Sequence, residues 1–353
     1  MKSGILLLLF TVIASLSVDA QKKVNNVIFM IGDGMGINQV YASLTANGSL
    51  TMTAFPYTGF VRTCSANRYI TDSAAAGTAL SSGRKTDNGV IGMSPESVKY
   101  VSIMEEAKEN GLGTGIVVTC TVTHATPAAY YAHQPDREMH EEIALDFTVS
   151  GIDVCIGGGK QYFMKRKDGK DLISDMESKQ YQVVFNQQEL DCIHSGKVMA
   201  LLANEDLPKV SEGRGDMLPE GTAKAIGILA EDYKEKGFFL MVEGSQIDWG
   251  GHANDQQYII SEVVDFDKAV KKALDFAEKD GNTLVIVTAD HETGGAAIID
   301  GDINRKEVKL AYTTKGHSAS LAPVFAYGPG AEEFSGYFDN TEFKAKIEKL
   351  AGF

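Results

Sequence analysis

Short apolar runs alternate along the chain with longer stretches in which apolar residues recur every three or four positions. The short runs predict buried strands at 27–31, 115–118, 238–242 and 284–287, with a shorter one at 324–326, because unbroken apolar sequence suits a strand covered on both faces. The longer, amphipathic stretches predict helices at 97–110, 138–148, 221–236 and 255–279.

Strands that alternate with helices favour an α/β fold, in which a mostly parallel sheet is covered by helices on both faces. Such sheets bind their ligands at the carboxyl ends of the strands. Residues 162–209 are more polar and less periodic, so we expect a surface excursion there and not a second domain. The chain from residue 21 to residue 353 is therefore predicted to form a single domain.

The first twenty residues have the pattern of a signal peptide. Lys2 is followed by an apolar run from 5 to 9 that continues to Ile13, and small residues lead to a plausible cleavage point after Ala20. This pattern predicts export to the periplasm or out of the cell. The later sequence offers no run of 18 or more apolar residues, so stable insertion into a membrane is not expected.

The formal net charge of −14 argues against nucleic acid as a general partner. An acidic protein that binds anionic substrates needs a local cationic centre, and metal ions are the obvious candidates. The four cysteines add little to this picture. Cys120 and Cys155 lie in apolar runs and are predicted to be buried free thiols, whereas the sequence leaves the state of Cys64 and Cys192 open.

Polar residues follow four of the predicted strands, at the edge where a site is expected. Asp33 follows the first, Thr126 the second, Glu243 the third, and the Asp290-His291 pair the fourth. Taken singly, each has an ordinary explanation as a turn, a helix cap or a loop residue. Because parallel strands bring their carboxyl ends to one edge, their joint occurrence predicts a single site.

Metal ligation is the chemistry that these residue types favour. Asp248 and His252 are four residues apart, so in a helical turn they share one face and can bind one ion. Nitrogen and carboxylate ligands together favour zinc, and His291 and His317 extend that set. The oxygens of Thr126 and Glu243 suit a harder ion such as magnesium.

Ser73 lies in the segment Thr-Asp-Ser-Ala-Ala-Ala-Gly-Thr-Ala at 71–79. One interpretation is an ordinary helix N-cap before a run of alanines. The other is a nucleophile at a helix N-terminus, where backbone N–H groups and the helix dipole receive a phosphate. A serine hydroxyl must be activated near neutral pH, and coordination to zinc would do this without a histidine base.

With these segments in hand, the chain resembles the alkaline phosphatases over residues 24–328, almost the whole length after the signal peptide. The segments that carry the resemblance are Asp-Gly-Met-Gly at 33–36, Thr-Asp-Ser-Ala-Ala at 71–75, His-Ala-Thr-Pro-Ala-Ala at 124–129, residues 243–252, Thr-Ala-Asp-His-Glu-Thr-Gly-Gly at 288–295, and Gly-His at 316–317. The second and fifth of these, in this order, are highly specific.

The resemblance implies hydrolysis of small-molecule phosphate monoesters through a phosphoserine on Ser73, with two zinc ions and one magnesium ion. It implies a three-layer α/β/α sandwich and gives Arg137 the role of gripping the phosphate. The resemblance implies these ligands for each ion: Asp248, His252 and His317 for one zinc; Asp33, Asp290, His291 and the Ser73 oxygen for the second; Asp33, Thr126 and Glu243 for magnesium.

Two departures from larger relatives bear on the metals and on assembly. His124 and Trp249 stand beside the implied ligands where enterobacterial members carry Asp and Lys, which changes how the third metal and the product phosphate are held. A homodimer is compatible with the resemblance, but only 25 residues (292–316) separate His291 from His317, which leaves little room for the crown insertion of vertebrate members.

The alternative function is a phosphodiesterase of the same superfamily. Related diesterases use a threonine nucleophile and lack the arginine, whereas this chain has Ser73 and Arg137. Sulfatases require a Cys- or Ser-Xaa-Pro-Xaa-Arg segment, and residues 74–76 are all alanine. A zinc-binding protein without turnover would have a broken nucleophile or ligand set, and neither is broken here.

Overall fold

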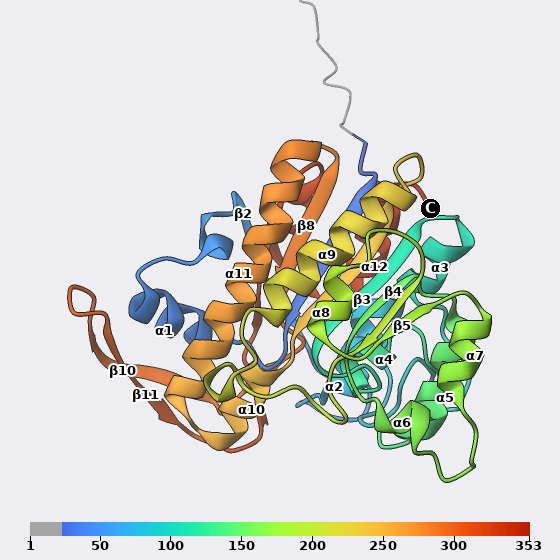
Figure 1. Ribbon diagram of the computed structural model, residues 1–353. Coiled ribbons are helices and arrows are strands. Elements are labelled where there is room, and N and C mark those ends of the chain that lie inside the picture. Colours follow the sequence, from blue (N-terminus) through green and yellow to red (C-terminus); the bar gives the residue numbers. More distant parts are fainter. Residues whose placement is uncertain (1–22) are drawn as a thin grey trace, which may run out of the picture.

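The computed structural model describes residues 23–353, which form a ten-stranded central sheet with helices around it (Figure 1). The strand order is β14-β2-β13-β8-β1-β7-β3-β4-β6-β5. All neighbours pair in parallel except β13, which is antiparallel to β2 and β8. The predicted α/β fold with a large, mostly parallel sheet is therefore confirmed.

The strands of the sheet are β1 (Asn26–Gly32), β2 (Tyr57–Arg62), β3 (Gly113–Thr121), β4 (Val154–Gly158), β5 (Gln182–Val184), β6 (Val198–Leu201), β7 (Phe238–Gly244), β8 (Thr283–Thr288), β13 (Ala322–Tyr327) and β14 (Gly336–Asp339). Two small antiparallel pairs lie outside it: β9 (Glu292–Thr293) with β12 (His317–Ser318), and β10 (Ala296–Asp302) with β11 (Glu307–Tyr312). Every residue of β1, β3, β7 and β8 is buried, as their unbroken apolar sequences predict.

The helices are α1 (Ile37–Asn47), α2 (Ser73–Ser82), α3 (Ile103–Glu109), α4 (Ala125–Ala128), α5 (His140–Ser150), α6 (Gln161–Met164), α7 (Leu172–Ser178), α8 (Gln187–Asp191), α9 (Met217–Asp232), α10 (Gln246–Ala253), α11 (Gln256–Asp280) and α12 (Glu342–Ala351). All four predicted helices are present. The first is shorter than predicted because its N-cap is Ser102, whose hydroxyl accepts from the Glu105 amide while the Glu105 carboxylate accepts from the Ser102 amide.

Two aromatic contacts on β7 show how the helices are layered on the sheet. Successive residues of a strand point to opposite faces. Phe238 packs against Phe276 of α11 with ring centroids 5.8 Å apart, and Phe239 stacks on Tyr130, which follows α4, at 6.2 Å. Helix α9 lies beside α11 on the near face in Figure 1. Helices therefore cover both faces, which confirms the predicted three layers.

The segment 162–209 is more than the surface excursion that its polarity predicts. It contributes β5 and β6, which extend the central sheet beyond β4 and form one of its edges. All four residues of β6 are buried. The prediction of a surface excursion is wrong for these two strands, because three- and four-residue strands at a sheet edge leave too short an apolar pattern to recognise.

Cys120 and Cys155 are buried free thiols on the adjacent strands β3 and β4, as predicted, and Cys64 and Cys192 are also free. Within residues 23–353, no helix is both long enough and apolar enough to cross a membrane. The predicted signal peptide, residues 1–20, lies outside the described residues.

Candidate metal centre

Four neighbouring strands, β8, β1, β7 and β3, run parallel and end at one edge of the sheet. The predicted ligands Asp33, Glu243, Asp290 and His291 lie at or just beyond the carboxyl ends of β1, β7 and β8. Thr126, in the first turn of α4, follows β3. The structure therefore brings together residues that lie more than 250 positions apart in the chain, as the strand pattern predicts.

Three clusters of side chains have ligand atoms within 4.8 Å of one another. The members of each are as follows: Asp248, His252 and His317 in the first cluster; Asp33, Asp290 and His291 in the second cluster; Cys120, His124 and Glu243 in the third cluster. The first two clusters match the implied zinc ligands. The third contains one implied magnesium ligand together with two residues that had no assigned role as ligands.

In the first cluster, helix α10 places Asp248 and His252 one turn apart, with His252 Nε2 3.2 Å from Asp248 Oδ2. His317 Nε2 lies 3.5 Å from Asp248 Oδ1. Both rings use Nδ1 to donate to a backbone carbonyl, His252 to Lys315 and His317 to Thr71 at 2.8 Å. These donations fix each ring with Nε2 facing the cluster, the orientation that a metal-ligating histidine requires.

The charges of the first cluster support each other. Burial alone would raise the pKa of Asp248, but its hydrogen bond to His252 and the neighbouring histidines lower it below its ordinary value. The same hydrogen bond raises the pKa of His252 to about 9. The cluster therefore carries an ionised carboxylate, which is the form that binds a cation.

The second cluster is completely buried: Asp33, Asp290 and His291 are each 0% exposed. His291 Nε2 lies 3.2 Å from Asp290 Oδ2, 3.5 Å from Asp33 Oδ1 and 3.2 Å from Ser73 Oγ. Burial raises the pKa of Asp290 to about 8 and that of Asp33 well above its usual range, and it lowers that of His291. Ser73 Oγ therefore contacts the histidine of a cluster whose two carboxyl groups are desolvated.

Unsatisfied oxygens in the second cluster fit a cation. Both oxygens of Asp33 and Oδ2 of Asp290 find no hydrogen-bond partner among residues 23–353. Asp290 Oδ1, by contrast, accepts from the backbone amide of Gly34 at 3.1 Å. A buried carboxylate without a partner is costly unless it pairs with a cation or coordinates a metal. Two of these free oxygens, Asp33 Oδ1 and Asp290 Oδ2, lie within 3.5 Å of His291 Nε2.

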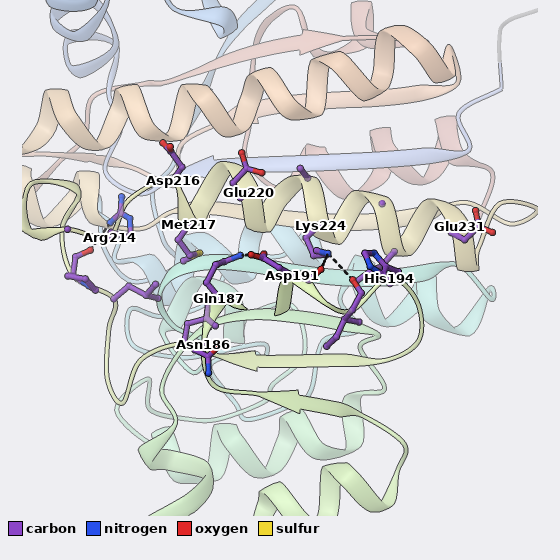
Figure 2. A pocket seen from close by; sticks show the side chains of 18 residues that line it. Asn186, Gln187, Asp191, His194, Arg214, Asp216, Met217, Glu220, Lys224 and Glu231 are labelled. Carbon is purple, nitrogen blue, oxygen red and sulfur yellow. Dashed lines mark hydrogen bonds between the residues drawn. The ribbon is translucent and has the colours of Figure 1, made fainter. Parts of the chain in front are cut away.

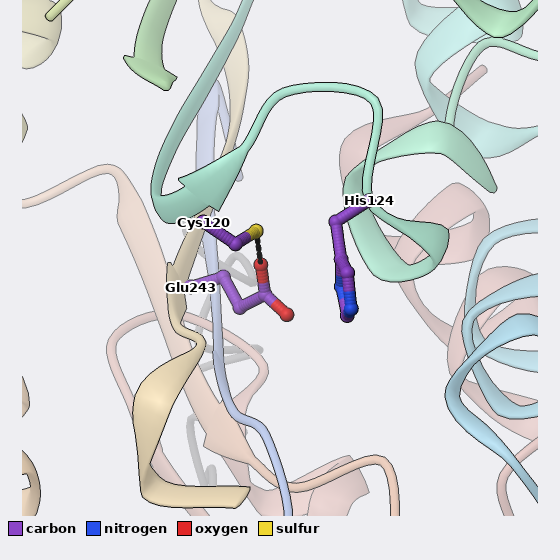
Figure 3. A group of neighbouring side chains, drawn as sticks. All are labelled: Cys120, His124 and Glu243. Carbon is purple, nitrogen blue, oxygen red and sulfur yellow. Dashed lines mark hydrogen bonds between the residues drawn. The ribbon is translucent and has the colours of Figure 1, made fainter. Parts of the chain in front are cut away.

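In the third cluster, Glu243 is also 0% exposed, and Figure 3 shows its carboxylate between Cys120 and His124. Its Oε2 accepts from Ser245 Oγ at 2.8 Å and from Cys120 Sγ at 3.4 Å. Its Oε1, Thr126 Oγ1 and His124 Nδ1 have no hydrogen-bond partner within the described chain. Burial raises the pKa of Glu243 to about 7. These free atoms again fit a cation.

Ser73 is the first residue of α2, and the residue before it organises the turn. Asp72 caps the helix by accepting from the Ala75 amide at 3.0 Å. Its other oxygen accepts from Arg137 Nη1 at 3.1 Å. Arg137 Nη2 lies 3.3 Å from His124 Nε2. The structure thus places Arg137 beside the turn that begins α2 and beside the third cluster, and Asp72 is a contact that the sequence interpretation did not assign.

The two residues singled out beside the ligands contact each other. The rings of His124 and Trp249 meet edge to face, with centroids 6.5 Å apart. Trp249 is half-buried and belongs to α10, between Asp248 and His252. Through these rings the third cluster is packed against the helix that carries the first cluster.

Thr293, which sequence reasoning missed, connects the first two clusters. Its hydroxyl donates to Asp248 Oδ1 and lies 3.2 Å from His291 Nδ1.

Residues that hold metal ligands in place affect metal affinity, because a misdirected ligand binds less well. We expect Thr293→Val to lower zinc affinity about tenfold, measured by competition with a chelator. Thr293→Ser keeps the hydroxyl and should bind zinc like the original; equal affinities for all three proteins would contradict this role.

A cavity of about 1050 Å³ lies apart from these clusters, between α9 and the segment that precedes it (Figure 2). Within the described part of the chain, its lining residues all fall between 186 and 231, outside the candidate site. Lys224 crosses it and donates to the backbone carbonyls of Asp191 and Ile193. The candidate site is therefore defined by its side-chain chemistry and not by this cavity.

Comparison with known proteins finds similarity to alkaline phosphatases, which agrees with the resemblance seen in the sequence. A family model described as alkaline phosphatase matches residues 24–307. Alkaline phosphatase 4 of Bacillus subtilis is 36% identical, over 96% of this chain and 91% of that protein. The alkaline phosphatase of Escherichia coli is 32% identical, over 94% of this chain and 87% of that protein.

Solved structures give the same result. The alkaline phosphatase from the Antarctic bacterium TAB5 is 44% identical to this chain, with a TM-score of 0.89 and coverage of 94% of this chain and 99% of that one. Two solved mutants of that enzyme, in which one histidine is replaced by aspartate or glutamate, hold magnesium in a site called M3.

Proposed function

The chain belongs to the alkaline phosphatase family of phosphomonoesterases, and we propose that it acts through a phosphoserine on Ser73 with two zinc ions and an auxiliary magnesium ion. One observation carries this proposal. Ser73 Oγ, at the start of a helix, lies 3.2 Å from His291 of a fully buried cluster, three of whose four carboxylate oxygens lack partners within residues 23–353. That arrangement places a nucleophile against a cation site.

The clusters divide between the ions according to their donor atoms. The first cluster, two histidines and a carboxylate, suits one zinc, and the second cluster suits the other. Oxygens of Thr126, Glu243 and Asp33 suit magnesium, and the magnesium in the M3 site of the TAB5 mutants supports this. When bound, the ions supply positive charge that favours ionised oxygen nucleophiles and leaving oxygens.

The residues of the chain then perform two displacements. The Ser73 hydroxyl loses its proton to solvent, its Oγ forms a bond to phosphorus, and the ester P–O bond breaks. The leaving oxygen takes a proton from solvent and departs as the alcohol. Water then attacks the phosphoserine, which restores Ser73 and releases inorganic phosphate. The N-terminus of α2 favours the anionic phosphoryl group. Arg137, oriented by Asp72, supplies two parallel N–H donors to its non-bridging oxygens.

Trapping the intermediate tests this proposal. The protein, loaded with zinc and magnesium, is mixed with a monoester labelled in the phosphate, quenched in acid and digested. We expect one labelled peptide, with the label on Ser73. Label on another residue, or hydrolysis at the full rate without any labelled protein, would contradict a phosphoserine at this position.

Arg137 should favour monoesters over diesters. A guanidinium fork matches two oxygens of one phosphate, and a monoester has three non-bridging oxygens, so two can bind the fork while the third faces the ions. A diester has only two, and its second ester group would crowd Arg137. We expect Arg137→Ala to lower kcat/KM for nitrophenyl phosphate about 100-fold, and that for methyl nitrophenyl phosphate much less.

Arg137→Lys provides the matched control, because it keeps the charge but loses the fork. We expect an intermediate loss for the monoester with this variant. Equal losses for both esters in Arg137→Ala would show that Arg137 does not set the preference, and would favour the alternative of a diesterase of the same superfamily.

We also propose export of the protein to the periplasm or beyond. The apolar run at 5–13 and the small residues before Ala20 support this. Sequencing the N-terminus of the protein recovered from the periplasm or medium should find Gln21 first, and a mature protein that begins at Met1 in the cell would contradict it.

Homodimer formation stays a prediction, which sedimentation of the purified protein tests.

A further inference from the structure

Glu292 is a buried residue beside the first two clusters and is a member of neither. It follows His291 of the second cluster, precedes Thr293, and is 3% exposed. The strand pair β9–β12 places it opposite Ser318, the residue after His317 of the first cluster. Glu292 therefore lies where the segments that carry the two clusters pair with each other.

Both carboxylate oxygens of Glu292 accept hydrogen bonds from the chain. Oε1 accepts from Gln39 Nε2 at 2.7 Å and from the Ala296 amide at 2.9 Å. Oε2 accepts from the Gly295 amide at 3.1 Å and from the Ser318 hydroxyl. A carboxylate offers about four acceptor positions, so these donors satisfy the side chain without an ion.

The carboxyl groups of the second cluster differ from Glu292 in this respect. Three of the four oxygens of Asp33 and Asp290 find no partner within residues 23–353, which fits a cation. Each oxygen of Glu292, by contrast, has two donors. The contacts of Glu292 are therefore those of a group that holds other parts of the chain in place.

The chain around Glu292 is built to admit its side chain. Gly36 is the N-cap of α1, and a Cβ added to it would lie 2.3 Å from Glu292 Cγ, which is too close for any larger residue. Gln39 of the same helix is 0% exposed and also donates to the Thr293 carbonyl at 2.8 Å. Helix α1 lies beside the hairpin β10–β11, which begins at Ala296 (Figure 1). Glu292 thus connects α1, the start of this hairpin and β12.

His317 is the ligand whose position depends most directly on this network. It lies on β12, which has only two residues, and its Nδ1 donates to the Thr71 carbonyl at 2.8 Å. An isolated pair of such short strands is marginally stable by itself. The hydrogen bond from Ser318 to Glu292 anchors β12 at the position next to the ligand.

We propose that Glu292 is a positioning residue, which fixes β12 and thereby holds His317 toward the ion of the first cluster. It acts through Ser318 and is not itself a ligand. Replacement of residues that orient metal ligands lowers metal affinity about 10- to 100-fold. This inference rests on the proposed metal-dependent function, because the histidine that it concerns is a ligand of the same centre.

Transfer of zinc from the loaded protein to a coloured chelator, in excess magnesium, tests this role without turnover. The first cluster includes the exposed His252, whereas the second is fully buried, so we expect two phases of release. The phase that His317→Ala accelerates is assigned to the first cluster. Glu292→Gln should accelerate that same phase about tenfold or more and leave the other phase unchanged.

Two serine variants provide a matched pair. Ser318→Ala removes the hydroxyl that donates to Glu292 and keeps the other contacts of the carboxylate, so it should accelerate the first-cluster phase to a smaller extent. Ser320 lies two residues further along and is exposed, so Ser320→Ala should release zinc like the original protein. If Glu292→Gln fails to fold, this pair decides, and equal release by both serine variants would overturn the proposal.

A double variant distinguishes positioning from a general effect on the fold. An effect that acts through His317 disappears when His317 is absent, so Glu292→Gln combined with His317→Ala should release zinc no faster than His317→Ala alone. Additive acceleration in the double variant would overturn the proposal. Acceleration of both phases by Glu292→Gln, or of neither, would do the same.

Failure of this inference is distinguishable from failure of the proposed function. Labelling of Ser73 by substrate phosphate in the original protein tests the function, and the rates of zinc release test the inference. A protein that forms the phosphoserine, but whose Glu292→Gln variant releases zinc like the original, would retain the proposed mechanism and lose only the role of Glu292.

Discussion

Replacement of Ser73 by alanine is expected to lower kcat for nitrophenyl phosphate by about four orders of magnitude and to abolish labelling of the protein by substrate phosphate. The reason is that the substitution removes the oxygen that bonds to phosphorus. The clusters, the N-terminus of α2 and Arg137 remain, so substrate should still bind. Residual turnover should come from direct attack by water in the same electrostatic environment.

The control lies on the same helix. Ser82 is buried in α2, and its hydroxyl donates to the Thr78 carbonyl at 2.6 Å, away from the clusters. Ser82→Ala should keep activity within about threefold, because an intrahelical hydroxyl contact contributes only about 1 kcal/mol to stability. Metal content and unfolding temperature are measured for both variants. Acid-stable label on the Ser73→Ala protein would exclude Ser73 as the nucleophile.

The sequence predicts the central strands of the sheet well, because a strand that is buried on both faces is an unbroken run of apolar residues. The strands β1, β3, β7 and β8 lie in the interior, so each is an unbroken apolar run. The edge strands β5 and β14 carry exposed residues and are only three or four residues long. Their pairing depends on tertiary contacts that no local pattern records.

Helix boundaries were less predictable, although one signal was present. Ser102 and Glu105 form a capping box that starts α3. The apolar pattern predicts a start at residue 97, but Ser97 has a φ of 64° and lies in a turn closed by the bridge between Met93 and Lys99. The Ser-Xaa-Xaa-Glu spacing would have placed the boundary correctly.

The parallel strand pattern predicts where the candidate site lies on the sheet, but it does not predict which side chains contact one another there. Parallel strands made it predictable that residues after β1, β7 and β8 would meet. No spacing in the chain could show that Thr293 bridges two clusters or that the Cys120 thiol faces Glu243. Those contacts depend on strand register and side-chain direction, which only the folded structure gives.

Removal of metal is expected to abolish hydrolysis of nitrophenyl phosphate. Three of the four carboxylate oxygens of the second cluster lack partners within residues 23–353 and fit cations, and without these ions Ser73 loses the positive charge that favours its ionised form. Zinc should restore most of the activity, and magnesium added with zinc should increase it further. Full recovery with magnesium alone would contradict the zinc assignment, which rests on the histidines of the first two clusters.

The metal-free protein should also become less stable as the pH rises from 7 to 9. Burial raises the pKa of Asp290 from 3.8 to about 8, so protonation favours the folded state and stability falls as pH rises toward 8. The pKa of His252, raised to about 9, adds a stabilisation that is complete below 6.5 and is lost as pH rises through 9. Each such proton contributes about 1.4 kcal/mol per pH unit.

Other groups of the centre do not cancel this trend. His124 and His291 have lowered pKa values, so above pH 7 they are neutral in the folded and the unfolded chain alike. Asp248 has a lowered pKa, so it is ionised in both states throughout this range. The pKa of Glu243 is raised to about 7, so its contribution to the free energy of unfolding also falls as the pH rises, as that of Asp290 does. The unfolding midpoint of the metal-free protein should therefore fall by roughly 5 °C or more between pH 7 and 9.

In the metal-loaded protein, the ions keep Asp33, Asp290 and Glu243 ionised, so this loss should be absent. Groups outside the centre, such as Glu348 with its pKa of about 7, titrate in both forms and cancel in the comparison. The measurement is the unfolding midpoint of chelated and reloaded protein at pH 7 and 9. If the unfolding midpoint of the metal-free protein stays the same from pH 7 to 9, the buried carboxyl groups do not have raised pKa values without metal, and this argument for a cation site fails.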